Sequence, residues 1–268
     1  MFQITILFLY IIAGVSLGAS RLVASDKHAR VLVFAALFCG TAGIAWHGTI
    51  LYNLISLPGG LALSIGNTVS FIGLQLALIA ILGGLEKSRR GLAGGLLILA
   101  AFASTATGLA AEPSGNGPSS WQMQAHILIS LFAYGLLTVG VIVAVFSLVQ
   151  DRRLRSGRIS ALNRLFSPLE TTESLLFGIA TGGFLVLLLA VVSGFAFVDN
   201  LFAQHLVHKT ALSLLALFLF GVLLAGRQFA GWRGRQAVYL YLWGFGVLCL
   251  AYFGTRYILE NMLGRSWS

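Results

Sequence analysis

The sequence has little charge and few cysteines. Of its 268 residues only 9% are Asp, Glu, Lys or Arg, whereas 58% are hydrophobic. Because soluble domains carry about 25% charged residues, this composition excludes an ordinary soluble protein. The two cysteines, Cys39 and Cys249, each lie in the middle of an apolar run and form no CxxC pair. The sequence therefore predicts neither a disulfide framework nor thiol chemistry.

Motifs for nucleotide-driven and hydrolytic chemistry are also missing. The chain has no GxSxG segment, no Walker motif and no Gly-rich dinucleotide fingerprint after a strand. No recognisable serine-histidine-acid or paired-carboxylate arrangement replaces them. We therefore expect a protein that is not an enzyme.

Long apolar runs fill most of the sequence. Each is close to the length of about 20 residues that crosses a hydrocarbon layer as a helix. We therefore predict an all-α, polytopic transmembrane bundle with eight spans, forming a single integral-membrane domain over residues 1–268. No internal repeat supports a transporter built from inverted halves. The first run has no evident cleavage site after it and is expected to be a retained span. The expected spans cover residues 3–20, 31–51, 61–83, 91–110, 124–149, 174–197, 208–226 and 237–258.

The formal charge of +9 comes mostly from alternate loops. Loops one, three, five and seven between the expected spans contain 14 of the 17 basic residues, and the other side has only Lys209, Arg256 and Arg265. The positive-inside rule then places both termini in the periplasm of a bacterial inner membrane. Because these positive charges orient the chain in lipid, nucleic acid is not an expected partner.

Four of the five histidines fall on the predicted outer side. His47 and His126 lie near the outer ends of spans two and five, and His205 and His208 lie in the last outer loop. Ionisable groups inside a membrane are costly and usually functional. The fifth, His28, is expected to be a solvated loop residue.

Such histidines can bind a transition metal, ligate heme iron or relay protons. The outer side offers few carboxylates and no thiol, whereas Phe, Trp, Tyr and Leu dominate the spans, which favours heme. Lys209 and Arg256 are candidates to neutralise the two heme propionates. The alternatives stay open, because a histidine in a span can simply bond neighbouring helices and one in a loop can simply be solvated.

Other polar side chains of the spans admit two interpretations. Ser130 and Tyr134 follow His126 at intervals of four, so they share its helix face and either line a ligand pocket or bond neighbouring helices. Asn67, Ser70 and Gln75 of span three must face the protein interior, because amides in lipid would cost several kcal/mol.

Several segments carry a family resemblance. They are HILISLFAYGLLTVGVIVAV from His126, ETTESLLFGIATGGFLVLLLAVVSG ending at Gly194, GWRGRQA from Gly231, and LSIGNTVSFIGL in span three. Together they resemble the cytochrome c assembly (CcsA/CcmC-type) superfamily, and more closely its YpjD/HemX-like inner-membrane branch. The resemblance implies a protein that handles heme b, with histidines at the outer face holding it for a partner such as an apocytochrome.

Within that resemblance His126 matches the histidine that opens the family's histidine-bearing span, and His208 is the candidate for the second. The full assembly proteins also carry a tryptophan-rich WWD-type motif in an outer loop, as a platform for heme. The corresponding segment here, FVDNLFAQHLVH, has no tryptophan.

We therefore expect a heme-binding or heme-handling membrane protein, with His126 and His208 as axial ligands and His47 as an alternative. Membrane lipid, heme and another membrane protein are its expected partners. The remaining alternatives are a permease for a small solute or protons, and a scaffold that acts through the arginine-rich inner loop at 151–172.

Overall fold

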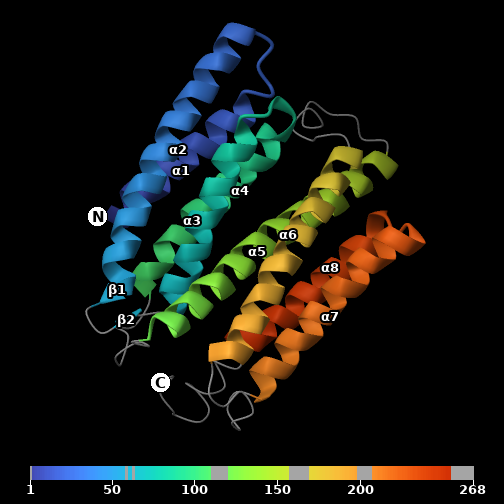
Figure 1. Cartoon of the computed structure of the whole chain (residues 1–268). Helices are drawn as coiled ribbons and strands as arrows, with labels where there is room; N and C mark the ends of the chain where they lie inside the picture. The colour runs from blue at the N-terminus through green and yellow to red at the C-terminus, as the bar shows by residue number, and fades with distance from the viewer. Residues whose placement is uncertain are drawn as a thin grey trace. The chain divides into compact units, whose positions relative to one another are not determined.

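The computed structural model describes residues 2–57, 60–61, 64–109, 120–156, 169–197 and 207–254. In this part of the chain eight helices are long and apolar enough to cross a membrane, which confirms the predicted bundle of eight spans (Figure 1). Their bounds are α1 Phe2–Ala19, α2 Asp26–Ile55, α3 Ile65–Gly84, α4 Arg90–Ser104, α5 Trp121–Arg155, α6 Leu169–Phe197, α7 Val207–Ala230 and α8 Gly234–Cys249.

Short elements extend or join these helices. Two 3₁₀ turns, η1 (Lys87–Arg89) and η2 (Thr105–Leu109), flank α4, and a π-helical turn, η4 (Leu250–Gly254), continues α8. Strands β1 (Ser56–Leu57) and β2 (Gly60–Leu61) pair between α2 and α3. This two-residue pairing is too small to change the all-α class.

The chain divides into two compact units. Unit 1 comprises Met1–Ser56, Leu63–Ala111 and Phe146–Thr172, and unit 2 comprises Leu57–Ala62, Glu112–Val145 and Glu173–Ser268. Unit 1 thus holds α1 to α4, and unit 2 holds α7, α8 and most of α5 and α6. The expectation of one membrane domain over residues 1–268 stays a prediction.

In unit 1 the backbones of α1 and α4 touch. A Cβ atom added at Gly94 would lie 2.6 Å from the carbonyl oxygen of Gly14, and one added at Gly14 would lie 2.7 Å from that of Gly94. Only glycine at both positions permits this approach, which is a common way for membrane helices to pack. The Tyr10 ring of α1 packs on Gly43 of α2, where an added Cβ atom would lie 2.8 Å from its Cε1.

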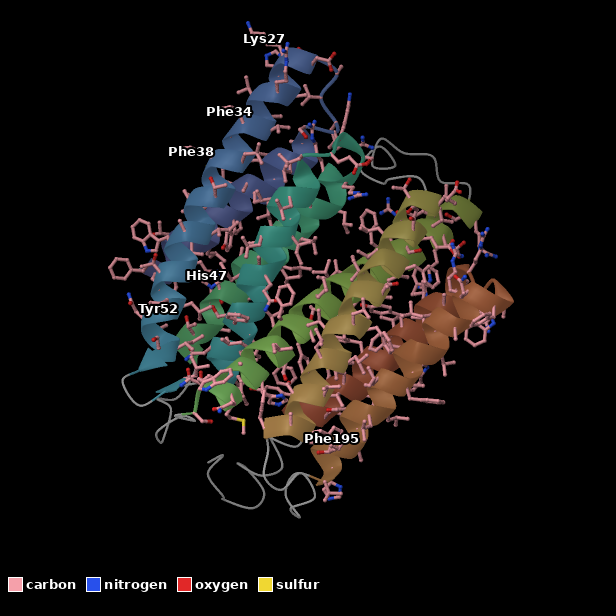
Figure 2. The ribbon with its side chains drawn as sticks, viewed as in Figure 1. Lys27, Phe34, Phe38, His47, Tyr52 and Phe195 are labelled. Carbon is pink, nitrogen blue, oxygen red and sulfur yellow. The ribbon has the colours of Figure 1, made fainter. Side chains whose placement is uncertain are left out.

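Helix α2 separates lipid-facing from interior residues. Phe34, Phe38 and Tyr52 are 77%, 70% and 69% exposed, and Figure 2 shows their side chains pointing away from the other helices of unit 1. His47 is 2% exposed and lies on the opposite face of α2. Lys27 marks the N-terminal end of α2 (Figure 2), where α2 begins earlier than its apolar run predicts.

Unit 2 is centred on Tyr241 of α8. Its hydroxyl donates to the carbonyl oxygen of Leu137 in α5 at 2.9 Å, and its ring packs edge-on against Phe220 of α7. A Cβ atom at Gly140 would overlap this hydroxyl, whereas one at Gly183 of α6 would meet the Leu137 side chain. Glycines of α5 and α6 therefore make room for the residues that join these helices to α8.

A three-residue turn joins α7 to α8. Gly231 and Gly234 have φ angles of 63° and 58°, which disfavour side chains, and this explains the two glycines of the GWRG segment. Arg227 holds the turn from α7: its guanidinium donates to Glu173 at 3.1 Å and to the Trp232 carbonyl at 3.4 Å. It also lies 4.6 Å from the ring centroid of Phe177.

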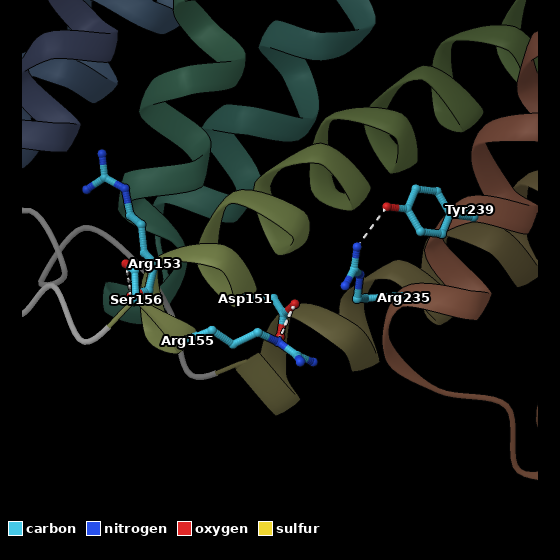
Figure 3. Close-up of polar contacts among 6 residues, drawn as sticks. All are labelled: Asp151, Arg153, Arg155, Ser156, Arg235 and Tyr239. Carbon is cyan, nitrogen blue, oxygen red and sulfur yellow. Dashed lines mark hydrogen bonds and ion pairs between the residues drawn. The ribbon is translucent and has the colours of Figure 1, made fainter.

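Helix ends extend beyond the apolar runs. Helix α5 continues to Arg155, where the Arg155 guanidinium pairs with Asp151 one turn earlier at 3.1 Å (Figure 3). Separately, Arg235 in the first turn of α8 donates to the Tyr239 hydroxyl at 3.2 Å (Figure 3). Charged residues assigned to loops by hydropathy thus belong to helix termini. The membrane orientation of the termini stays a prediction.

Candidate functional site

Unit 1 contains a buried imidazole with a partner on each nitrogen. His47 Nδ1 lies 3.2 Å from the Tyr10 hydroxyl of α1, and its Nε2 lies 2.7 Å from the Ser70 hydroxyl of α3. Tyr10 and Ser70 are fully buried. A hydroxyl can donate or accept, so either tautomer of His47 is satisfied. The arrangement ties three helices together through one side chain.

The neighbouring polar residues of α3 are also interior. Asn67, Ser70 and Gln75 are 6%, 0% and 5% exposed, which confirms that these side chains avoid lipid. Ser64 caps α3 by accepting a hydrogen bond from the Asn67 backbone at 3.0 Å. Unit 1 therefore has a polar interior around the first three turns of α3.

Unit 2 holds its imidazole differently. His126, in the second turn of α5, is half-buried, and its Nδ1 lies 2.9 Å from the Ser193 hydroxyl of α6. The ring lies over Gly194, where an added Cβ atom would be 3.1 Å from His126 Cε1. Ser193 thus engages Nδ1, and the backbone carbonyl of Ala190 in α6 is a further partner of the ring.

A lysine accompanies His126. The Lys209 ammonium interacts electrostatically with the His126 imidazole, and it lies 5.7 Å from the ring centroid of Tyr252 in η4. The start of α5, the end of α6, the start of α7 and the end of α8 therefore meet at one end of unit 2. We call His126, Ser193, Gly194, Lys209 and Tyr252 the His126 cluster.

The π-helical turn shapes this end of unit 2. The Tyr134 hydroxyl donates at 2.8 Å to the carbonyl of Leu248, just before α8 widens into η4. The Tyr134 ring also contacts Tyr252, with centroids 5.7 Å apart. Single π-helical turns occur often at functional sites. Tyr134 therefore bonds between α5 and α8, and its hydroxyl is already used.

Aromatic rings border the His126 cluster. Trp121, the first residue of α5, packs against Phe197, the last of α6, with centroids 6.4 Å apart, and Tyr252 packs edge-on against Phe253. Trp121 is 70% exposed. Helix ends therefore supply flat apolar rings here, although the loop segment FVDNLFAQHLVH has no tryptophan.

The structure separates the predicted site residues into three groups. His126, Lys209 and Tyr134 lie together at one end of unit 2, whereas His47 belongs to unit 1. His208 is exposed in the first turn of α7, and its role as second ligand stays a prediction. His205 and Arg256 lie outside the described residues. The predicted convergence of the histidines on one membrane face likewise stays a prediction.

The donors do not form a conventional metal centre within the described ranges. There, no three side chains of His, Cys, Asp or Glu gather closely enough to hold an ion. A zinc site usually has three or four such ligands, whereas heme iron needs one or two axial ligands. The His126 cluster contributes one imidazole.

Three functional candidates were not foreseen from sequence. Tyr10, Ser193 and Tyr252 are ordinary residues of apolar runs, and their importance comes from partners on other helices. Ser193 does fall within the segment VVSG that carries the family resemblance. A polar residue directly before a glycine in an apolar run was the available signal.

Comparison with known proteins decides the family. The model of the family described as cytochrome C assembly protein matches residues 42–263, which is most of the chain. The chain belongs to the cytochrome c assembly protein family. The match includes the His126 cluster, α3 with its polar face, and the turn between α7 and α8.

Curated relatives of this cytochrome c assembly protein include bacterial membrane proteins. The inner membrane protein YpjD of Escherichia coli is 35% identical over 138 residues, which cover 52% of each chain. An uncharacterised 28.8 kDa protein of Azospirillum brasilense is 30% identical over 172 residues, or 63% of each chain. The cytochrome c biogenesis protein CcsA of Guillardia theta is 22% identical over 166 residues, 56% of this chain and 55% of its own. The matched segments thus span about half to three fifths of these relatives. No solved structure matches the chain.

Proposed function

We propose that this protein binds heme b in the inner membrane and handles it, without enzymatic turnover, in a process of the cytochrome c biogenesis type. The observation that carries the proposal is the His126 cluster, in which a half-buried imidazole has one nitrogen held by Ser193 and a lysine beside it. The names of the CcsA relatives, which are cytochrome c biogenesis proteins, support the same direction. The name of the relative YpjD, an inner membrane protein, supports the location in the inner membrane.

The chemistry of the cluster fits heme in three respects. His126 offers an imidazole nitrogen, the usual axial ligand for heme iron. Lys209 offers a cation for a propionate, and the rings of Tyr252, Trp121 and Phe197 offer apolar surface for a porphyrin face. Heme would supply an iron centre with open coordination, and the protein's part is to hold and orient it. His208 is the proposed second ligand, and Arg256 and His205 are proposed auxiliary residues.

Titration of the purified protein with hemin tests this function. We expect a saturable Soret band with one hemin per chain in detergent or nanodiscs. His126→Ala should weaken binding by at least about 10-fold, as loss of a metal ligand does. Wild-type protein that is folded yet shows no saturable band would overturn the proposal.

Presentation of heme to a second protein is the finer part of the proposal. The acceptor would be an apocytochrome or another membrane protein, which must reach the end of unit 2 where the His126 cluster lies. A transfer assay with hemin-loaded protein and an apocytochrome would detect movement of the Soret band. Retention of all hemin by the protein would limit its role to binding.

A second candidate function has one observation in its favour. The polar residues of α3, together with His47, are buried within unit 1, as expected for a path taken by protons or a small solute. Proton flux measured in proteoliposomes, with Ser70→Ala as the test variant, would detect such a path. Equal flux in wild-type and empty liposomes would exclude proton conduction and leave helix bonding as the role of these residues.

A further inference from the structure

The hydrogen bonds of Ser193 bear on which ring nitrogen of His126 carries the hydrogen. The Ser193 hydroxyl donates to the backbone carbonyl of Ala190 at 2.9 Å, one turn earlier in α6. A carbonyl oxygen only accepts, and a serine hydroxyl has a single hydrogen. When its hydrogen is directed to Ala190 in this way, Ser193 can act only as the acceptor toward His126 Nδ1, 2.9 Å away. In that arrangement Nδ1 carries the hydrogen, and in the neutral ring Nε2 then carries the lone pair.

Gly194 fixes where the ring lies. An added Cβ atom would be 3.1 Å from Cε1, 3.7 Å from Nδ1 and 3.8 Å from Nε2 of His126. The imidazole thus packs directly on the α6 backbone, and a side chain here would push it away by a few tenths of an ångström. The two adjacent residues provide a hydrogen-bond acceptor and a flat surface.

We propose that Ser193 and Gly194 are positioning residues that hold His126 as the Nδ1–H tautomer, so that Nε2 is the nitrogen presented to a metal-bearing ligand. The ligand part of this inference rests on the proposed heme function, whereas the tautomer part does not. Histidines that ligate metals usually donate their other N–H to such a partner, which orients the ring and increases its basicity. Ser193 would have this role here.

The histidine of unit 1, His47, has ring partners of a different kind. His47 has hydroxyl partners on both nitrogens, at 3.2 and 2.7 Å, so its contacts select neither nitrogen for an outside partner. Those hydroxyls can reverse direction together, which leaves the tautomer of His47 undetermined. Of these two histidines, His126 alone has a hydroxyl partner whose hydrogen bonds a backbone carbonyl, so Ser193 selects its tautomer.

Nitrogen NMR of the protein without heme tests the tautomer directly. Histidine labelled with ¹⁵N distinguishes protonated from unprotonated ring nitrogens, and the His126 signals are assigned by their loss in His126→Gln. The measurement is made above about pH 8, where histidines with ordinary pKa values near 6.5 are neutral. We expect wild-type His126 to be predominantly Nδ1–H, and Ser193→Ala to shift it toward the other tautomer.

Two variants separate positioning from general structural effects. Ser193→Thr keeps the hydroxyl and should keep the wild-type tautomer. Ser130→Ala is the matched control, because the Ser130 hydroxyl bonds the backbone carbonyl of His126 at 2.8 Å and does not touch the ring. It should leave the ring signals unchanged. Wild-type His126 as Nε2–H, or no change in Ser193→Ala, would overturn the inference.

Hemin titration then tests the ligand part. We expect Ser193→Ala to weaken hemin binding about 10-fold, the lower end of the usual effect of a ligand's hydrogen-bond partner. Ser193→Thr and Ser130→Ala should bind as the wild type does. If the tautomer shifts as expected but wild-type protein binds no hemin, the proposed function fails while the tautomer assignment holds. If hemin binds equally to wild type and Ser193→Ala, the positioning role in ligation is wrong.

Discussion

His47 in unit 1 and His126 in unit 2 are both histidines of apolar helices, yet the contacts of their rings differ. His47 is 2% exposed and has a hydroxyl on each nitrogen, from Tyr10 and Ser70. His126 is half-buried, with Ser193 on one nitrogen and a lysine nearby. A histidine in a membrane span can thus be fully engaged by neighbouring helices, as His47 is, and the proposed ligand role falls to His126.

The packing of the two units differs in a related way. In unit 1, α1 and α4 meet backbone to backbone at Gly14 and Gly94, which gives the helices little room to move. In unit 2, Gly183 faces the Leu137 side chain, which can change its rotamer. The Gly14–Gly94 contact is therefore rigid, whereas the Gly183–Leu137 contact can adjust by a change of rotamer.

The largest expected effect tests this difference in packing. Gly94→Ala places a methyl group 2.6 Å from the Gly14 carbonyl oxygen, and neither backbone can yield without separating α1 from α4. We expect a loss of about 3 kcal/mol in the free energy of unfolding, at the upper end of overpacking effects. The measurement is thermal or denaturant unfolding in detergent.

The adjacent glycine is the control. No described atom lies within 4 Å of a Cβ atom added at Gly95, so Gly95→Ala should leave stability unchanged or slightly higher. Gly183→Ala in unit 2 should have an intermediate effect, because Leu137 can move. Equal stability of Gly94→Ala and Gly95→Ala would contradict the close contact between α1 and α4.

A smaller effect is expected from the hydroxyls around His47. Tyr10→Phe removes the partner of Nδ1 and leaves that buried nitrogen without a hydroxyl, so stability should fall by about 1.5 kcal/mol, near the maximum seen for hydrogen bonds between membrane helices. Tyr52→Phe is the matched control, because it removes the same hydroxyl from a side chain of unit 1 that is 69% exposed. It should leave the free energy of unfolding unchanged. If both variants unfold alike, the Tyr10 to His47 bond contributes no stability.

The sequence predicted the helices better than their partners. Apolar length alone located all eight spans, but α2 begins at Asp26 and α5 ends at Arg155, because charged residues can continue a helix beyond the hydrocarbon layer. The pairing of His126 with Ser193 spans 67 positions and depends on the register between α5 and α6, which no local pattern determines.

Some of the site was accessible from sequence and some was not. His126 was predicted as a site residue because it is an ionisable group in a span, and Lys209 because it is one of few basic residues on the predicted outer side. The structure brings the two together. That His47 belongs to the other unit was not predictable, because a ligand and a residue that bonds neighbouring helices can have the same residue type and the same depth in a span. The π-helical turn η4 has no sequence signature of its own.

The smallest effect is expected from Lys209. Lys209→Gln removes the cation beside His126 and should weaken hemin binding about 3-fold, or about 0.6 kcal/mol, as suits a partly exposed charge. Hemin dimethyl ester has no propionate charge, so wild type and Lys209→Gln should bind it equally. Arg235→Gln is the matched control, since Arg235 also lies over a tyrosine ring, at 5.8 Å. If Lys209→Gln weakens binding of the dimethyl ester as much as binding of hemin, Lys209 does not contact a propionate.

The most direct test of the difference between the two histidines is hemin affinity measured by Soret absorbance in two variants of equal folded content, His126→Ala and His47→Ala. We expect His126→Ala to lose at least the roughly 10-fold in affinity that removal of a ligand's hydrogen-bond partner costs, while His47→Ala loses thermal stability but binds hemin as the wild type does. Loss of hemin binding in folded His47→Ala, with binding retained in His126→Ala, would contradict the account.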